Sequence, residues 1–174
     1  MNSKGVTLVE LVAVLAVAGI LAAIAVPAFR AMLQEQRRQM IVSELVATLK
    51  MARTEAVVRH TPMVVRASDK GWGWGWKVVP DRRGLPSSSS TVLRERVLDG
   101  AIRIEGNLWM RKEVRFNTFG AVAGVGGAGN PGTLFVCDRN NKARTRLILS
   151  WAGRLRLDKS YVRNRDDECR KSLK

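Results

Sequence analysis

The hydropathy pattern begins with an uncharged apolar run near the N-terminus. Residues 11–29 contain no charged residue and no Gln, Asn or Ser. A helix of this length, at about 1.5 Å per residue, is long enough to cross the apolar core of a bilayer. A cleavable secretory signal would have a shorter apolar core with a cleavage site after it, whereas this run continues into an amphipathic segment. The pattern therefore predicts a membrane anchor that stays with the protein.

Beyond this run the chain predicts an amphipathic continuation of the same helix. Apolar residues recur at steps of three and four, as they do on one face of a helix. This stripe consists of Met40, Ile41, Leu45, Leu49, Ala52 and Ala56. Thr61-Pro62 is predicted to end the helix, because proline disfavours helical backbone in the residue before it. A helix over residues 8–60, kinked near Pro27, would span roughly 80 Å.

After Pro62 the pattern changes to short β-prone segments. Residues 63–66 and 76–79 are rich in Val and bounded by turn formers. The alternating Gly and Trp of residues 71–76 would place three tryptophans on one face of an extended strand. We favour a core position for Trp76. For Trp72 and Trp74 two interpretations stay open, namely core packing against the helix or an aromatic platform that stacks on bases.

The main feature that the composition adds is a large positive net charge. The 174-residue chain has 30 Lys+Arg against 15 Asp+Glu, a formal net charge of +15, which predicts attraction to nucleic acid, anionic lipid or an acidic partner. One His and two Cys cannot supply a Cys/His zinc cluster, and a Ser-His-Asp triad would have to use His60. We therefore expect no enzyme, no cofactor and no metal site.

The residues before the apolar run resemble the type IV prepilin signal. A short basic leader ends at Gly5, and Glu10 lies at the start of the apolar helix, where a carboxylate is costly unless it is paired or reaches the interface. The resemblance implies that prepilin peptidase cleaves between Gly5 and Val6 and methylates the new amine of Val6, although the family usually has Phe there. It also implies that Glu10 meets the freed amine of a neighbouring subunit during filament assembly. The alternative for Glu10 is a carboxylate at the membrane surface.

The same residues predict a topology. Lys4 before the span places the N-terminus in the cytoplasm by the positive-inside tendency, so the rest of the chain would lie across the membrane. The prepilin resemblance implies that this is the inner membrane, that the rest of the chain lies in the periplasm and that the subunit later joins an extracellular pilus. The predicted parts are a leader at residues 1–5, a membrane and filament-core helix at 6–29, its amphipathic second half at 30–61 and a β-rich domain at 62–174.

Several blocks of the chain, read together, resemble the GspH/FimT family of minor pilins and pseudopilins. They lie at residues 52–56, 75–81, 116–120, 132–138 and 147–150. The resemblance covers most of the chain and implies an α+β type IV pilin fold, in which a long N-terminal helix packs on a small antiparallel β domain of two sheets. It also implies other major and minor pilins as partners.

Cys137 and Cys169 are the two cysteines of the sequence, and the predicted topology places both outside the cytoplasm. A disulfide is expected there, with two free thiols as the alternative. The bridge would close a loop of roughly 33 residues and stabilise the fold by about 3–4 kcal/mol in the chain-entropy model. It would tie the basic C-terminal tail to the β domain.

The C-terminal tail concentrates positive charge. Residues 137–174 contain twelve Lys+Arg and five acidic residues. If a hairpin pairs Ser150 with Arg154, Leu147 meets Leu157 and Leu149 meets Leu155 on the buried side. Arg146, Arg154 and Arg156 then share the outer side, with Asp158 opposite Arg146. Arginines two residues apart on a strand lie ~6.5–7 Å apart, comparable to neighbouring phosphates. The alternative is an ordinary solvated face.

Residues 153–156 also resemble the Gly-Arg-x-Arg motif of FimT minor pilins, which bind DNA for natural transformation. The resemblance implies that Arg154 and Arg156 contact DNA and that Gly153 forms the turn presenting them. Further candidates without a motif are Lys142, Arg144, Arg146, Lys159, Arg163 and Arg165. Contacts to phosphates of double-stranded DNA would be salt-dependent and insensitive to sequence. The alternative is a structural minor pilin or type II secretion pseudopilin that primes filament assembly and does not bind DNA.

Overall fold

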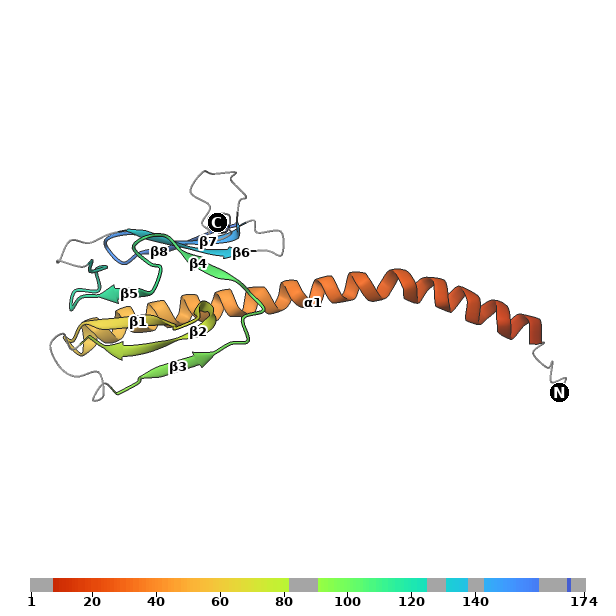
Figure 1. The fold of residues 1–174 in the computed structure, drawn as a ribbon, viewed down its shortest axis with the longest axis horizontal. Helices are drawn as coiled ribbons and strands as arrows, with labels where there is room; N and C mark the ends of the chain where they lie inside the picture. The colour runs from red at the N-terminus through yellow and green to blue at the C-terminus, as the bar shows by residue number, and fades with distance from the viewer. Residues whose placement is uncertain (1–7, 82–90, 125–130, 138–142, 160–168, 170–174) are drawn as a thin grey trace. The chain divides into compact units, whose positions relative to one another are not determined.

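The computed structural model describes residues 8–81, 91–124, 131–137, 143–159 and 169. The chain divides into two compact units, residues 1–41 and 42–174. Helix α1 (Leu8–Val58) contributes to both units and continues through Pro27 (Figure 1). The predicted cleavage residues Gly5 and Val6 lie outside the described residues.

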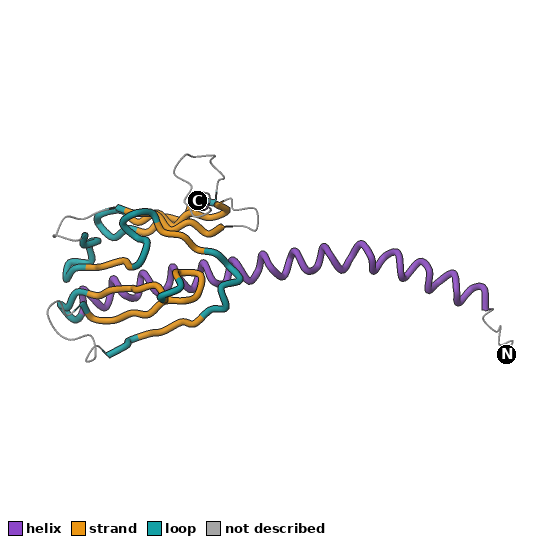
Figure 2. The backbone as a smooth tube through the Cα atoms, in the orientation of Figure 1, coloured by secondary structure: helices purple, strands orange, loops and turns teal. Residues whose placement is uncertain are grey.

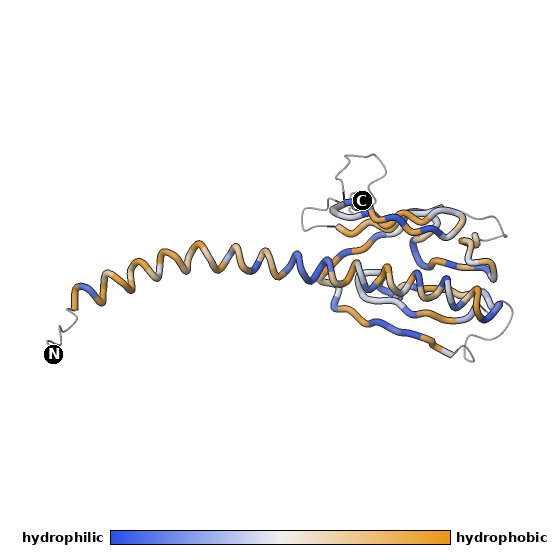
Figure 3. The backbone as a smooth tube through the Cα atoms, turned by 180° about the vertical axis from the view of Figure 1, so that it is seen from behind, coloured by the Kyte–Doolittle hydropathy of each residue, from blue (hydrophilic) through white to orange (hydrophobic). Residues whose placement is uncertain are grey.

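The first unit contains the apolar part of α1. Its side chains up to Leu33 are solvent-exposed, and the most apolar window of the helix has a mean hydropathy of 2.7. Figure 3 shows this apolar stretch along the N-terminal part of the helix. Among the described residues, α1 is long and apolar enough to cross a membrane. Glu10 lies in its first turn, where the helix dipole favours negative charge.

The second unit contains residues 42–58 of α1 and two four-stranded antiparallel sheets (Figure 2). The first sheet has the order β3-β2-β1-β5, and the second has the order β4-β6-β7-β8. The strands are β1 (Met63–Ser68), β2 (Gly71–Pro80), β3 (Arg94–Val97), β4 (Ile104–Gly106), β5 (Glu113–Phe116), β6 (Gly132–Cys137), β7 (Ala143–Leu149) and β8 (Leu155–Asp158). This arrangement confirms the predicted α+β fold with two small antiparallel sheets.

The core of the second unit lies around the amphipathic part of α1. Leu45, Leu49, Ala52 and Ala56 are buried, as the three- and four-residue spacing predicted. Of the predicted pair at the start of this stripe, Ile41 is buried, whereas the prediction was wrong for Met40, whose side chain lies on an exposed face of the helix. The helix ends at Val58, two residues before the predicted end. His60 then adopts a left-handed conformation with φ of 48°, and Thr61 N donates to Ala56 O at 3.2 Å.

The prediction that three tryptophans share one strand face was wrong. Trp72 and Trp76 are buried, at 1% and 2% exposure, whereas Trp74 is 41% exposed and lies under the Lys70 ammonium at 4.8 Å. The alternation breaks because the β1–β2 register shifts between Ala67 and Ser68, and Gly75 has a φ of +124°. The two buried rings belong to the core, so this strand offers no platform of three aromatic rings.

Candidate nucleic-acid interface

The predicted hairpin near the C-terminus has the register that the sequence indicated. Leu147 pairs with Leu157, Leu149 with Leu155 and Arg146 with Asp158, and Ser150 N donates to Arg154 O at 3.0 Å. Leu147 and Leu149 are each 1% exposed, which confirms the buried side of β7. The expected burial of Leu157 was wrong, since it is 42% exposed on the edge strand β8.

Arg154 and Arg156 project from the turn and from β8 into solvent. Both residues are exposed. Neither side chain forms a hydrogen bond or ion pair with any other residue that the structure describes. Within the part of the chain that the structure describes, the turn and β8 thus present two guanidinium groups without a compensating carboxylate, an arrangement suited to binding phosphate.

Gly153 is required by the geometry of this turn. Its φ is +74°, a value that side-chain-bearing residues rarely adopt, and an added Cβ would lie 2.1 Å from the carbonyl oxygen of Gly120. Its N–H donates to Ser150 O at 2.9 Å, and the backbone N–H of Arg154 donates to Ser150 Oγ at 3.2 Å. The glycine therefore lets two turns approach closely and fixes the backbone that carries Arg154.

Arg53 of α1 ties these two turns to the helix. Its Nε donates to Gly120 O at 3.0 Å and its Nη2 donates to Ala152 O at 3.3 Å. Sequence reasoning placed Arg53 in a family block but assigned it no role. No sequence pattern indicates this role, because the sequence alone does not distinguish a half-buried arginine on a helix from a solvated one.

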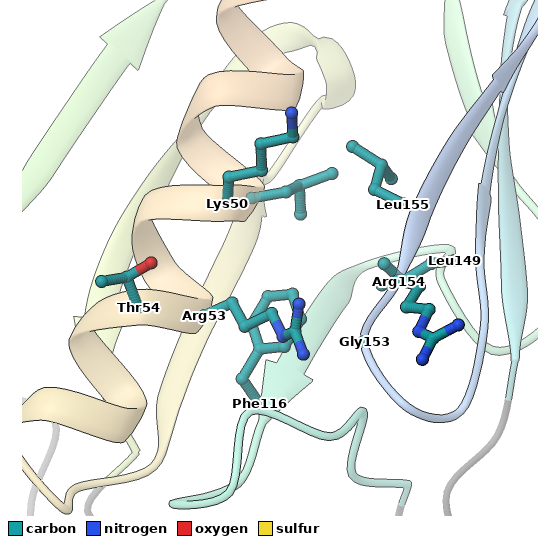
Figure 4. Close-up of a pocket in the computed structure, with 9 residues that line it drawn as sticks. Lys50, Arg53, Thr54, Phe116, Leu149, Gly153, Arg154 and Leu155 are labelled. Carbon is teal, nitrogen blue, oxygen red and sulfur yellow. The ribbon is translucent and has the colours of Figure 1, made fainter.

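A cleft of about 490 Å³ lies between α1 and the β7–β8 turn, within the second unit (Figure 4). Its lining residues are Leu49, Lys50, Arg53, Thr54, Phe116, Leu149, Gly153, Arg154 and Leu155. Three of these residues are cationic and none is acidic. Sequence reasoning missed Lys50 as part of this site, because only the tertiary fold brings the helix beside β8.

Arg146 has a different environment from the two exposed arginines. Its Nη2 lies 2.5 Å from Asp158 Oδ2, and the two side chains are 17% and 18% exposed. The structure thus confirms the predicted position of Asp158 opposite Arg146. Because the carboxylate neutralises this guanidinium, we leave Arg146 out of the proposed site.

Other basic residues are also compensated by carboxylates. Arg115 contacts Asp81 at 2.5 Å and Glu113 at 2.6 Å. Burial alone would lower the pKa of the Arg115 guanidinium, but its hydrogen bonds to Asp81 and Glu113 outweigh this effect and raise the pKa. Arg94 and Arg96 of β3 both contact Glu44 of α1, at 3.8 and 3.1 Å. These pairs support the fold and leave little net positive charge at their positions.

The structure describes only some of the other basic residues that were predicted to contact DNA. Lys159 directly follows β8 and is exposed. The backbone of Arg144 belongs to β7, whereas Lys142, Arg163 and Arg165 lie outside the described residues.

The predicted disulfide between Cys137 and Cys169 is confirmed, with a Cα–Cα distance of 5.8 Å. Both cysteines are buried in a cluster with Phe135. Arg103 Nη2 also donates to Cys169 O at 2.9 Å. These contacts fix Cys169 against the second sheet.

A long apolar N-terminal helix and a unit of two small antiparallel sheets define the type IV pilin fold. Two crystal structures of the type IV minor pilin FimU from Pseudomonas aeruginosa strain PAO1 share it. Their TM-scores are 0.59 and 0.57 and their sequence identities 25% and 26%. The matches cover 77% and 74% of this chain and 97% and 98% of the FimU chains. No curated protein sequence matches the chain.

The chain belongs to the GspH family. The family described as type II transport protein GspH matches residues 42–153, and the prokaryotic N-terminal methylation motif matches residues 1–26. The protein is therefore a membrane-anchored minor pilin or pseudopilin. Its N-terminal motif implies processing by prepilin peptidase and assembly with other pilins. The GspH match ends at Gly153, so Arg154 and Arg156 lie just beyond it.

Proposed function

We propose that this minor pilin binds extracellular double-stranded DNA without sequence preference during DNA uptake in natural transformation. Arg154 and Arg156 contact the phosphates, and Gly153 shapes the turn that presents them. The observation that carries the proposal is the pair of exposed guanidinium groups that have no partner among the described residues. Phosphate contacts provide affinity without reading bases, as uptake of arbitrary DNA requires.

The architecture of the turn supports this role. Arg156 lies on β8, Arg154 directly precedes this strand, and both residues are exposed. Residues two positions apart in extended backbone have Cα atoms ~6.5–7 Å apart, comparable to neighbouring phosphates. Gly153 and Arg53 fix the turn against its neighbour at Gly120. A fixed backbone reduces the entropy lost when the side chains engage a phosphate. Lys159, Lys142, Arg144, Arg163 and Arg165 stay predicted helpers.

The N-terminal predictions complete the proposal. Prepilin peptidase cleaves between Gly5 and Val6, and the methylated amine of Val6 begins the mature subunit. Glu10 meets such an amine on a neighbouring subunit in the filament. The subunit resides in the inner membrane with its β-rich part in the periplasm, and then joins the pilus that carries the DNA-binding turn outside the cell.

The direct test is DNA binding by full-length protein in a nonionic detergent. Wild-type protein is titrated into fluorescent duplexes of unrelated sequence at about 0.1 M salt and compared with the Arg154→Ala/Arg156→Ala variant. We expect the wild type to bind all duplexes with similar affinity. The variant should bind roughly 30- to 100-fold more weakly at this salt concentration, because it loses two phosphate contacts and each contact contributes about 0.9 to the slope of log K against log salt. Duplex binding that survives the double substitution would contradict the proposed site.

The matched control removes two cations from another turn. Arg111 and Lys112 are adjacent, exposed and without a side-chain partner among the described residues. Their joint replacement by Ala changes the net charge by the same amount as the test variant. Because nonspecific attraction depends on net charge, the control separates a local site from a general charge effect. We expect the control to lose less than about threefold in affinity.

A second function is a structural minor pilin or pseudopilin that primes filament assembly and does not bind DNA. It is favoured by the family match, whose description refers to type II transport and whose matched residues stop before Arg154. Under this alternative the wild-type protein would leave all duplexes unbound at low salt, and the two exposed arginines would contact other pilins.

A further inference from the structure

We infer that helix α1 forms one wall of the DNA interface, and that a backbone phosphate is held in the cleft between Lys50 of α1 and Arg154 of the β7–β8 turn. The inference rests on the proposed function and adds a second element to the site. It assigns a ligand-binding role to Lys50 and a positioning role to Arg53. The chemistry recognised is the phosphodiester group of a nucleic acid strand.

The charge distribution around the cleft supports a bound anion. Lys50 and Arg53 line the helix wall, Arg154 lines the opposite wall, and the lining residues include no carboxylate (Figure 4). Lys50 is exposed and its ammonium group has no partner among the described residues. Figure 4 shows the Lys50 ammonium and the Arg154 guanidinium pointing in different directions, and both side chains are long and flexible enough to turn toward an anion in the cleft.

The acidic residues on the elements forming these walls are engaged elsewhere. On the part of α1 within the second unit, Glu44 contacts Arg94 and Arg96, and Glu55 pairs with Arg59. On β8, Asp158 pairs with Arg146. None of these carboxylates lines the cleft, so the described residues do not cancel its positive potential locally.

The floor of the cleft strengthens the interaction with an anion. Leu49, Phe116, Leu149 and Leu155 line it, and apolar surroundings weaken the screening of charge by water. The volume of about 490 Å³ lies in the range of small-ligand sites, which is enough for a phosphodiester group.

Arg53 acts as the positioning residue between the two walls. Its hydrogen bonds to Gly120 O and Ala152 O use one Nε–H and one Nη2–H donor. Its guanidinium carries five N–H donors, so further donors remain for a phosphate oxygen. Through Ala152 it also holds the turn from which Arg154 projects.

The test compares Lys50→Ala with Lys77→Ala in full-length protein in nonionic detergent. Lys77 is an exposed lysine on β2 that does not line the cleft, so both variants lose one lysine charge. Fluorescent duplex is titrated across a salt series. We expect Lys50→Ala to weaken binding roughly fivefold to tenfold at 0.1 M salt and to reduce the salt slope by about 0.9, because one phosphate contact is lost. Lys77→Ala should stay within about twofold of wild type.

Two further variants distinguish a phosphate contact from a structural effect. Lys50→Arg retains the charge and should retain duplex binding. In the Arg154→Ala background, Lys50→Ala should cost less than it does alone, because residues that hold one group are coupled. Thermal unfolding followed by circular dichroism should be the same for wild type and Lys50→Ala, since the side chain is exposed.

The outcomes separate this inference from the proposed function. If Arg154→Ala/Arg156→Ala abolishes binding while Lys50→Ala behaves like Lys77→Ala, the protein binds DNA and the cleft inference is wrong. Equal salt slopes for Lys50→Ala and wild type would contradict the phosphate contact in the same way. Absence of duplex binding by the wild-type protein would overturn both.

Discussion

Replacement of Trp76 by Ala is expected to lower the free energy of unfolding of the β-rich unit by about 3–5 kcal/mol. The Trp76 side chain is 2% exposed, and its indole Nε1 donates to Thr48 Oγ1 at 3.2 Å. The substitution leaves a large cavity and removes the hydrogen bond between Trp76 of β2 and Thr48 of α1. It thereby loosens the helix segment that carries Lys50 and Arg53. Denaturant unfolding followed by circular dichroism measures the change.

Trp74 on the same strand provides the matched control. It is 41% exposed, so Trp74→Ala should cost less than about 1.5 kcal/mol. Trp76→Phe retains most of the ring and loses the hydrogen bond, and we expect an intermediate cost of about 1–2 kcal/mol. Equal costs for Trp74→Ala and Trp76→Ala would contradict the opposite environments that the structure gives to these two residues.

Removal of the disulfide is expected to cost about 3–4 kcal/mol of unfolding free energy. Cys137 and Cys169 are 32 positions apart, so the bridge restricts a long loop in the unfolded chain. The loop includes β7, the turn with Gly153 and β8. The Cys137→Ala/Cys169→Ala variant should therefore unfold at lower denaturant than wild type under oxidising conditions.

Reducing the disulfide of the wild-type protein measures the same contribution to stability without a substitution. Reductant should lower the stability of wild type toward that of the double variant and leave the double variant unchanged. A wild-type protein whose unfolding midpoint is insensitive to reductant would contradict a stabilising bridge. Duplex titration of the double variant under native conditions would then show how strongly Arg154 and Arg156 depend on the bridge for their positions.

The sequence predicted the fold correctly where only one arrangement of the chain buries the apolar residues of a pattern. The three- and four-residue spacing from Leu45 to Ala56 identified the buried helix face, because amphipathic helices bury one stripe. The alternation around Leu147 and Leu149 gave the β7–β8 register, since a slip by one residue would bury Arg146 and expose both leucines. Two cysteines that the predicted topology places outside the cytoplasm left few alternatives to a bridge.

The sequence failed where long-range contacts decide the outcome. Strict alternation placed Trp74 with Trp72 and Trp76, but a register shift and the positive φ of Gly75 turn it to solvent. Leu157 was assigned to the core, although β8 is an edge strand and covers it incompletely. Lys50 and Arg53 looked like ordinary helix-surface charges. Their place beside Arg154 depends on how α1 packs against the second sheet, which no local pattern encodes.

The two arginines of the proposed DNA site, Arg154 and Arg156, lie beyond the segment that the family model matches. The family match covers residues 42–153, which include the C-terminal part of α1, strands β1 to β7 and the turn up to Gly153. The exposed arginines follow this segment directly and contribute no described side-chain contact to the fold. We therefore expect that replacing these two side chains has little effect on the stability of the fold.

The salt dependence of duplex binding by the full-length protein tests the central claim most directly. Affinity for one duplex is measured from about 0.05 to 0.3 M salt and repeated with a duplex of unrelated sequence. We expect the logarithm of the association constant to fall linearly with the logarithm of the salt concentration. The slope should be about −2 to −3, for two or three phosphate contacts, and equal for both sequences. Absence of binding at the lowest salt, or a slope near zero, would contradict a DNA-binding pilin.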